Sequence, residues 1–194
     1  MFQIRIHGRG GQGVVSASEL LSVAAFEEGK YSQSFPSFGS ERMGAPVQAF
    51  ARIDDKAITL REPVMEPDML IIQDPTLFNA INVFDGVNPQ GYLLINSSRT
   101  PEELGIEEVM NKFPANHAVT IPATELALKY IKQPKPNTVL LGAFAALTHI
   151  VQMPALEKAI NDKFRGKIAE VNIVAMSAGY NLVQKMLTEP SAVT

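Results

Sequence analysis

The sequence contains no cysteine and only three histidines, His7, His117 and His149. Without cysteine the chain cannot form a disulfide, supply a thiolate nucleophile or ligate an iron–sulfur cluster. The three histidines do not show the spacing of metal ligands. These absences exclude a disulfide framework, a zinc finger and a cluster held by cysteines of this chain.

Long hydrophobic runs and an excess of positive charge are missing as well. No run of about 18 apolar residues suggests a membrane span, and Arg5 and His7 interrupt the first apolar stretch, unlike a signal peptide. Seventeen lysines and arginines stand against twenty acidic residues, a formal charge of −3, so there is no basic stripe for nucleic acid. We therefore expect a cytoplasmic protein with no nucleic-acid partner and no membrane span.

Length and composition suit one compact unit. The 194 residues are 46% hydrophobic and 19% charged, which is ordinary for a soluble globular protein and enough to bury a core. No internal repeat, low-complexity tract or linker divides the chain. We expect a single domain over residues 1–194.

Strand-like runs alternate with helical periods along the chain, which favours an α/β fold with a largely parallel central sheet. Strands are expected at 2–7, 47–53, 69–74, 91–98 and 117–123, and helices at 14–28, 101–113, 124–131, 137–151, 153–164 and 167–187. Residues 57–63, after the polar turn at 54–56, are expected to pair as a hairpin and make the sheet mixed. The fold expected is three-layered and Rossmann-like, with a helical C-terminal third that covers one sheet face or forms an interface.

Several residues are expected to mark the ends of elements. Gly29 is expected to stop the first long helix, because glycine accepts a left-handed conformation. Asp74 or Thr76 is expected to cap a helix with Pro75 in its first turn, and Asn137 or Thr138 to cap the helix that follows. Pro154 is expected in the first turn of the next helix. His7 is interpreted as a strand-end side chain hydrogen-bonded to backbone, ahead of a role in proton transfer.

A glycine-rich turn follows the first expected strand, with glycines at Gly8, Gly10, Gly11 and Gly13. The spacing Gly-x-Gly-x-x-Gly between a strand and a helix is typical of dinucleotide sites, where backbone amides approach a pyrophosphate. That template also requires a second strand ending in an acidic residue to bind the ribose. The corresponding region, 31–44, has no such ending. Two alternatives remain: a freestanding NAD(P) or FAD site, and glycines that only permit a tight strand-to-helix turn without binding a ligand.

The region 31–46 predicts a long proline-containing loop that carries apolar side chains. Phe35, Phe38 and Met43 lie there among small polar residues with no helix or strand period. Apolar side chains on such a loop require something to cover them.

Two segments together resemble the γ subunit of the 2-oxoacid:acceptor oxidoreductases, the group that includes pyruvate:ferredoxin oxidoreductase. They are GRGGQG at 8–13 and SFPSFGSERMGAPVQAFARI at 34–53. In the second segment Gly39, Glu41, Gly44 and Ala45 match the family pattern. Met43 stands where an arginine is common in the family, and Arg42 precedes it. The resemblance covers essentially the whole chain, and its most specific motifs lie in residues 8–53.

The resemblance implies a subunit that is not active alone. In the family, α and β subunits bind thiamine diphosphate with Mg, and a ferredoxin-like δ subunit carries [4Fe-4S] clusters. The reaction is oxidative decarboxylation of a 2-oxoacid, pyruvate or an aromatic acid such as phenylglyoxylate, with coenzyme A to acyl-CoA. Electrons pass to ferredoxin or, through an added flavoprotein subunit, to NAD. These cofactors would be bound mainly by the partner subunits.

The resemblance gives the two segments a joint role at a surface against the catalytic partner subunits. Backbone amides around Gly8, Gly10, Gly11, Gln12 and Gly13 are predicted to approach the phosphates of thiamine diphosphate or coenzyme A, with a pure packing role as the alternative. No catalytic or metal-ligating residue is expected. A ligand-free interaction subunit is the further alternative. The residues predicted to lie at the subunit interface are Phe35, Phe38, Gly39, Glu41, Arg42, Met43 and Gly44.

Overall fold

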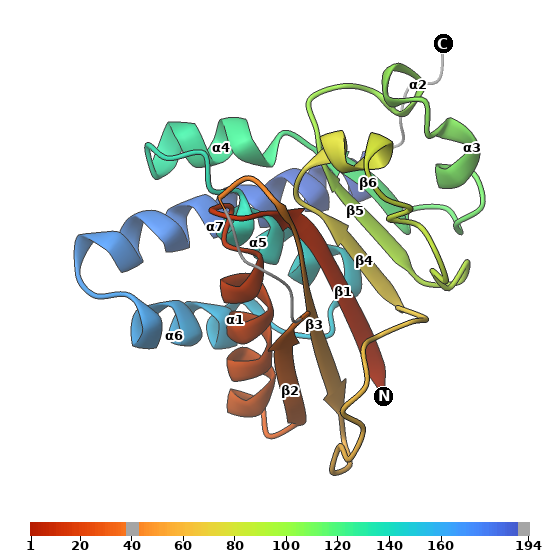
Figure 1. Cartoon of the computed structure of the whole chain (residues 1–194). Helices are drawn as coiled ribbons and strands as arrows, with labels where there is room; N and C mark the ends of the chain where they lie inside the picture. Colours follow the sequence, from red (N-terminus) through yellow and green to blue (C-terminus); the bar gives the residue numbers. More distant parts are fainter. Residues whose placement is uncertain (38–42, 190–194) are drawn as a thin grey trace.

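The first strand of the chain lies inside a six-stranded sheet, between strands that come from later segments (Figure 1). The computed structural model describes residues 1–37 and 43–189. In spatial order the strands are β2 (Tyr31–Pro36), β3 (Pro46–Asp54), β1 (Phe2–Arg9), β4 (Met69–Ile72), β5 (Tyr92–Asn96) and β6 (Ala118–Ile121).

Four adjacent strands are parallel, and the two strands at one end of the sheet, β3 and β2, add antiparallel pairs. β1, β4, β5 and β6 form a parallel set, whereas β3 is antiparallel to both β1 and β2. All four residues of β4 are buried, as expected for a parallel strand that is covered on both faces. The expected α/β fold with a largely parallel, mixed sheet is confirmed.

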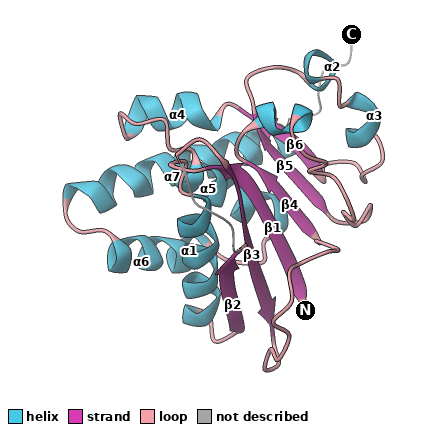
Figure 2. Ribbon diagram, viewed as in Figure 1, coloured by secondary structure: helices cyan, strands magenta, loops and turns pink. Residues whose placement is uncertain are grey.

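The longer helices cover one face of the sheet (Figure 2). They bury the side chains of Ile4 and Ile6 in β1 within one large hydrophobic core. Helix α5 lies at the centre of this layer, with all twelve of its residues buried, so the helical last third does cover a sheet face. The helices of this layer are α1 (Val14–Glu27), α4 (Ala123–Tyr130), α5 (Asn137–Thr148), α6 (Met153–Lys163) and α7 (Lys167–Thr188).

Helices α5 and α7 approach each other closely through two glycines. A Cβ atom on Gly142 of α5 would lie 1.9 Å from the carbonyl oxygen of Met176 in α7. A Cβ atom on Gly179 of α7 would lie 2.1 Å from the carbonyl oxygen of Val139 in α5. The absence of a side chain at both positions lets the two backbones touch, which fixes the distance between the helices.

The opposite face of the sheet is covered by short helical segments and by extended loops (Figure 1). The segments are the 3-10 helix η1 (Pro75–Asn79) and the helices α2 (Pro101–Leu104) and α3 (Glu107–Met110). They enclose a smaller core made of Leu70, Ile72, Leu77, Val83, Leu93, Ile95, Ile106 and Phe113. The sheet is thus the middle of three layers. The layer of long helices on one face is thicker than the layer of short helices and loops on the other.

Arg5 connects β1 to the loops on this thinner face. Its buried guanidinium donates hydrogen bonds to the carbonyl oxygens of Val64 (3.4 Å), Met65 (3.2 Å) and Val83 (3.2 Å), and to that of Asp85. Burial lowers the pKa of Arg5, and the Asp85 charge opposes this effect. One side chain therefore satisfies backbone carbonyls from two separate loops.

Two predictions about the sheet are wrong, and both concern the neighbours of β3. Residues 57–63 form no strand; Arg52 of β3 instead donates to the Glu62 carbonyl oxygen at 2.6 Å, and Gln33 donates to that of Leu60 at 2.8 Å. The hairpin partner of β3 is β2, which was expected to be part of a loop. Because β2 is a partly exposed edge strand with small polar residues, it shows no apolar alternation.

Most of the predicted element ends are confirmed. Gly29 follows the end of α1 with a φ of 78°, and Pro154 lies in the first turn of α6. The carboxylate of Asp74 accepts a hydrogen bond from the Thr76 amide and caps η1, with Pro75 in its first turn. None of the described helices is both long enough and apolar enough to cross a membrane.

Two predicted helix ends differ in the structure. α5 has no side-chain cap, because Pro136 occupies the N-cap position and Asn137 and Thr138 are already inside the helix. The expected helix 101–113 is divided into α2 and α3 at Gly105, which has a φ of 69°. A left-handed residue at this position ends the first helix and turns the chain before the second.

Candidate functional site

The glycine turn lies at the carboxyl edge of the sheet, where the connections of two adjacent strands diverge. β1 continues into α1 on the thick helical face, and β4 continues into η1 on the thin face (Figure 1). In open α/β sheets such a reversal leaves a crevice outside the strand ends, which is the usual place for a ligand. The turn between Gly10 and Gly13 therefore stands at the position where the fold itself favours binding.

The glycines of the turn serve two different physical needs. Gly11 and Gly13 have φ angles of 96° and 79°, which residues with a side chain rarely adopt. A Cβ atom on Gly8 would lie 2.6 Å from Val14 Cγ2, and one on Gly13 would lie 2.5 Å from Asn137 Nδ2. The turn is thus packed against α1 and the start of α5, which supports the packing interpretation for Gly8 and Gly13.

The first turn of α1 presents backbone amides towards a cavity. Gly13 is the N-cap and supplies no side chain, and the amides of Val14, Val15 and Ser16 donate to no other residue in the described ranges. A cavity of about 590 Å³ borders these residues and the loops before α5 and α7. Arg9 and Lys135 contribute the charged groups of its lining, and none of the described lining residues is acidic. Such a site suits an anion.

The second signature segment packs directly on the glycine turn. The Gly10 amide donates to the Ala45 carbonyl oxygen at 2.9 Å, and the Gly44 amide donates to the Gly10 carbonyl oxygen at 3.1 Å. The Met43 sulfur would lie 2.7 Å from a Cβ atom on Gly11, although 88% of Met43 is exposed to solvent. The structure therefore brings the described ends of the two predicted segments together.

The remaining predicted interface residues do not all join this contact. Phe35 is half-buried in β2, with its ring 5.2 Å from that of Phe50 and beneath the Arg52 guanidinium at 5.4 Å. Its own sheet thus covers part of the ring. Four other predicted interface residues lie outside the described part of the chain, namely Phe38, Gly39, Glu41 and Arg42.

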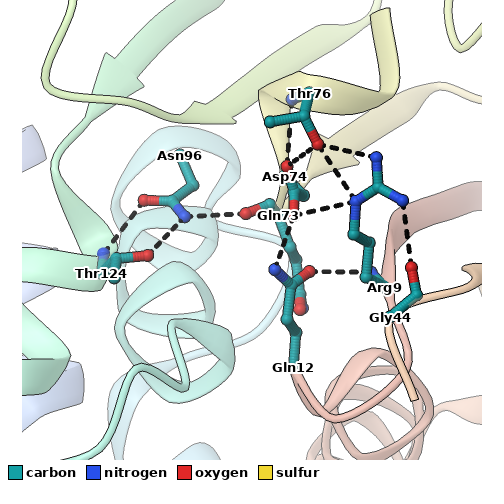
Figure 3. A network of polar contacts seen from close by, with 8 residues as sticks. All are labelled: Arg9, Gln12, Gly44, Gln73, Asp74, Thr76, Asn96 and Thr124. Atoms are coloured by element: carbon teal, nitrogen blue, oxygen red, sulfur yellow. Dashed lines mark hydrogen bonds and ion pairs between the residues drawn. The ribbon is translucent and has the colours of Figure 1, made fainter. Parts of the chain in front are cut away.

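Arg9 ties the turn to two other segments, a role that no pattern in the sequence assigned to its side chain (Figure 3). Its guanidinium donates to Thr76 Oγ1 from Nε (3.0 Å) and Nη2 (2.8 Å), and to the Gly44 carbonyl oxygen from Nη1 (3.0 Å). The same Nε lies 3.3 Å from Asp74 Oδ2. Arg9 thereby holds together the glycine turn, the β4–η1 connection and the segment at Gly44. Its position inside the turn was the only signal in the sequence.

Gln12 and Asp74 complete this network. Gln12 Oε1 accepts from the Arg9 amide at 2.7 Å, and Gln12 Nε2 donates to Asp74 Oδ2 at 2.8 Å. Burial raises the pKa of Asp74, but hydrogen bonds from Thr76 and Gln12, helped by the Arg9 charge, outweigh it and leave this pKa below its usual value. Asp74 is therefore both the predicted helix cap and the charged partner of the turn.

His7, directly before the turn, is buried without the hydrogen bond that was predicted for it. Only 1% of the residue is exposed, and neither ring nitrogen has a partner among the described residues. Burial, with the nearby Arg5 charge, lowers the pKa of His7 to about 3. The ring thus stays neutral in the folded protein across the physiological range. No group of three or more His, Asp or Glu in the described ranges is placed to hold a metal ion.

This low pKa predicts a loss of stability in mild acid. In the unfolded chain His7 becomes protonated as the pH falls through about 6.5, whereas the folded chain keeps it neutral, so protons favour unfolding. Between pH 7 and pH 5.5 the parent should lose about 1 kcal/mol of unfolding free energy more than a His7→Leu variant does. Urea titrations across this range measure the difference. Parallel pH profiles of the two proteins would contradict the expectation.

The sequence matches the family described as "Pyruvate ferredoxin/flavodoxin oxidoreductase" over residues 3–182. Pyruvate synthase subunit PorC of Methanocaldococcus jannaschii is 46% identical over 185 residues, which cover 95% of this chain and 98% of that protein. The pyruvate/ketoisovalerate oxidoreductases common subunit gamma of Pyrococcus furiosus is 43% identical over 180 residues, or 93% and 96% of the two chains.

A solved structure resembles this chain over a similar share of its length. The crystal structure of pyruvate oxidoreductase subunit PORC from Thermotoga maritima superposes with a TM-score of 0.77 at 39% identity. The match covers 93% of this chain and 95% of that one. The likeness in sequence and in fold thus extends over almost the whole length.

Proposed function

The chain belongs to the pyruvate ferredoxin/flavodoxin oxidoreductase family, and from that premise we propose that it is the gamma subunit of a 2-oxoacid:ferredoxin oxidoreductase complex. The observation that carries the proposal is the match, over more than nine-tenths of both chains, to PorC and common-gamma subunits. The chain would act in an oxidoreductase as one part of an assembly rather than alone.

The proposed reaction is the oxidative decarboxylation of a 2-oxoacid with coenzyme A, which yields acyl-CoA and reduces ferredoxin. Partner subunits would bind thiamine diphosphate with Mg. They would also hold the iron–sulfur clusters, because this chain has no cysteine to ligate a cluster. Thiamine diphosphate supplies the carbanion chemistry at the substrate carbon, so the protein contributes binding and orientation. An added flavoprotein subunit that reduces NAD remains part of the proposal.

Pyruvate is the proposed 2-oxoacid, as the names of the relatives suggest. The name of the Pyrococcus furiosus relative states that one gamma subunit is common to pyruvate and ketoisovalerate oxidoreductases. A shared subunit is poorly placed to choose between two substrates. We therefore assign the choice of 2-oxoacid, including an aromatic acid such as phenylglyoxylate, to the partner subunits.

Within the complex, we propose that the glycine turn binds a phosphate group of coenzyme A. The amides of Val14, Val15 and Ser16 offer donors at the 590 Å³ cavity, and Lys135 offers positive charge, whereas the charge of Arg9 is already paired with Asp74. The exposed Met43, with the segment that follows Gly44, would form the adjoining surface against a partner subunit. A freestanding dinucleotide site has less support, because β2 ends at Pro36 without an acidic residue for a ribose.

The subunit role is tested by what accompanies the chain. A tagged chain expressed from its native genome should copurify with α and β subunits and with a ferredoxin-like protein that has eight cysteines. The same assembly lacking this chain should not reduce ferredoxin with pyruvate and coenzyme A. Binding of NAD(P) or FAD by the isolated chain in calorimetry would instead favour the freestanding oxidoreductase.

The phosphate role is tested by Gly11→Val in the assembled complex. Valine at a φ of 96° strains the backbone of the turn, so the amides there must shift. The contact of its Cβ atom with the Met43 sulfur, at 2.7 Å, adds little, because the exposed Met43 side chain can move away. We expect the KM for coenzyme A to rise at least about tenfold, which corresponds to about 1.4 kcal/mol of binding. Steady-state kinetics and subunit assembly are to be measured separately.

Gly29→Val is the matched control for this variant. Gly29 has a comparable φ of 78° at the other end of α1, and a Cβ atom there would meet nothing within 4 Å. It should strain the backbone without changing the KM for coenzyme A. If Gly11→Val weakens assembly while the remaining complex keeps its affinity for coenzyme A, the turn has a packing role and the phosphate proposal fails.

A further inference from the structure

A second cavity lies at the carboxyl ends of β4, β5 and β6, and the proposed phosphate site does not include it. Its volume is about 350 Å³, and its lining includes Gln12, Gln73, Asn96 and Thr124. The glycine turn separates the two cavities, since Gly10, Gly11 and Gly13 border the first and Gln12 borders the second. A ligand that reaches both would lie across the turn.

Most polar side chains around this second cavity already use their hydrogen-bonding groups within the protein (Figure 3). Asn96 Nδ2 donates to the Gln73 carbonyl oxygen at 2.7 Å and to Thr124 Oγ1 at 2.8 Å, and Asn96 Oδ1 accepts from the Thr124 amide at 3.0 Å. Asp74 accepts from Gln12 and Thr76 as described above. The wall of the cavity is therefore rigid and preorganised.

Among the buried side chains of the described lining, that of Gln73 is the exception. It lines the cavity and is only 1% exposed, yet neither its Nε2 nor its Oε1 has a hydrogen-bond partner in the described part of the chain. Leaving a buried amide unpaired is unfavourable, and native structures rarely tolerate it without a reason. The neighbouring Asn96 is fully paired, so the unpaired state is not shared by every amide near this cavity. The buried His7 ring, at the end of the adjacent strand β1, is the other unpaired side chain near this edge among the described residues.

The charges around the cavity argue against an anionic ligand. Asp74 and Glu125 line it together with a single cation, Arg99. Asp74 is paired with Arg9 (Nε to Oδ2, 3.3 Å), which leaves Glu125 and Arg99 as opposite charges at the second cavity. The first cavity keeps the cation Lys135, and its described lining has no acidic residue. The second cavity thus suits an uncharged polar group, whereas the first suits a phosphate.

We propose that Gln73 is a recognition residue for a neutral group that carries a hydrogen-bond donor and an acceptor side by side. An amide such as glutamine pairs with such a group through both of its polar atoms. The inference rests on the proposed function, because it assigns this group to the same coenzyme A whose phosphate would lie at the glycine turn. The ligand would place its phosphate in the cationic cavity and its neutral part at Gln73.

Coenzyme A offers this pattern at the edge of its adenine ring. Each trans amide of its pantetheine arm turns its N–H and C=O to opposite sides, so it can meet Gln73 through one of them only. Two fragments separate these two parts of coenzyme A. Pantetheine has the amides but no adenine, and adenosine 3′,5′-bisphosphate has the adenine but no amide. Each fragment is to be measured as a competitor of coenzyme A with the assembled complex and with a Gln73→Met complex, since methionine keeps the length of the side chain and removes the amide.

In the Gln73→Met complex the KM for coenzyme A should rise about tenfold, the loss expected for well-formed hydrogen bonds to a buried amide. One of the two fragments should lose affinity by a similar factor, which identifies the part of coenzyme A that Gln73 contacts. The matched control is Gln184→Met, because Gln184 on α7 is partly buried and donates to the Ala146 carbonyl oxygen at 3.4 Å, away from both cavities. Gln184→Met should leave the KM for coenzyme A and the affinities for both fragments unchanged.

Thermal unfolding separates a recognition role of Gln73 from a structural one. A structural role predicts a lower unfolding midpoint in the variant, whereas a recognition role does not. The ligand-free Gln73→Met complex should unfold at the same temperature as the parent or higher, since the variant removes an unpaired buried amide. A lower midpoint would show that the amide is paired in the folded protein and would overturn the inference. Unchanged affinity for coenzyme A and for both fragments would overturn it too, even if Gly11→Val raises the KM and the proposed function stands.

Discussion

Replacing Arg5 with methionine is expected to lower the free energy of unfolding by about 3 kcal/mol. Methionine keeps an apolar side chain of similar length between the sheet and its covering loops, so the packing of the stem is preserved. The carbonyl oxygens of Val64, Met65, Val83 and Asp85 lose the donor that they share. Both loops are then free to separate from the thin face of the sheet.

Urea unfolding measures the loss, and hydrogen exchange locates it. Amides at 62–66 and 83–87 should exchange faster in Arg5→Met, while those of α5 should keep their relative order of protection. Arg61→Met is the matched control, because Arg61 is exposed and a surface substitution of this kind should change stability by less than about 0.5 kcal/mol. A loss below about 1 kcal/mol in Arg5→Met would show that the loops are held by apolar contacts instead.

Gly142→Ala is expected to destabilise the protein by a similar amount, about 3 kcal/mol, although alanine normally favours a helix over glycine. The added methyl group would lie 1.9 Å from the Met176 carbonyl oxygen, which is backbone and cannot rotate away. Helix α7 must therefore move outward, and the core between it and α5 loses contacts. Chemical denaturation gives the change in stability directly.

The reciprocal glycine provides an internal check. Gly179→Ala pushes the same two backbones apart, so the double variant should cost clearly less than the sum of the single ones. Ser177→Ala, two residues earlier on α7 and partly exposed, should change the free energy of unfolding by less than about 0.5 kcal/mol. An increase in stability for Gly142→Ala, as helix propensity alone predicts, would contradict the close approach.

Sequence patterns predicted the elements whose environment is uniform and missed those that depend on distant partners. The apolar runs of β4 and β5 are buried on both faces, and β6 alternates partly exposed with buried residues, so local patterns reveal all three strands. β2 is a polar edge strand that exists because β3 offers it an antiparallel partner. Residues 57–63 follow a turn and carry apolar side chains, yet Arg52 holds their backbone in a loop, and no local pattern encodes that contact.

The same distinction holds at the candidate site. The glycine turn was recognisable because its strand, its spacing and its helix are contiguous in the sequence. The contacts of Arg9 with Gly44 and Thr76 join residues 35 and 67 positions away, and they could not be read from the chain. The unpaired state of Gln73 is a property of its surroundings, so only the three-dimensional arrangement reveals it.

The position of β1 within the sheet has a consequence for the time course of folding. β1 leaves the ribosome before its partners, which are β3, starting at Pro46, and β4, ending at Ile72. At usual translation rates these residues follow after on the order of ten seconds, and α5, which closes the core, follows later still. During this interval Ile4 and Ile6 have the early helix α1 to pack on but no strand to pair with. The nascent chain should therefore depend on holding factors at the ribosome more than a protein built from local hairpins would.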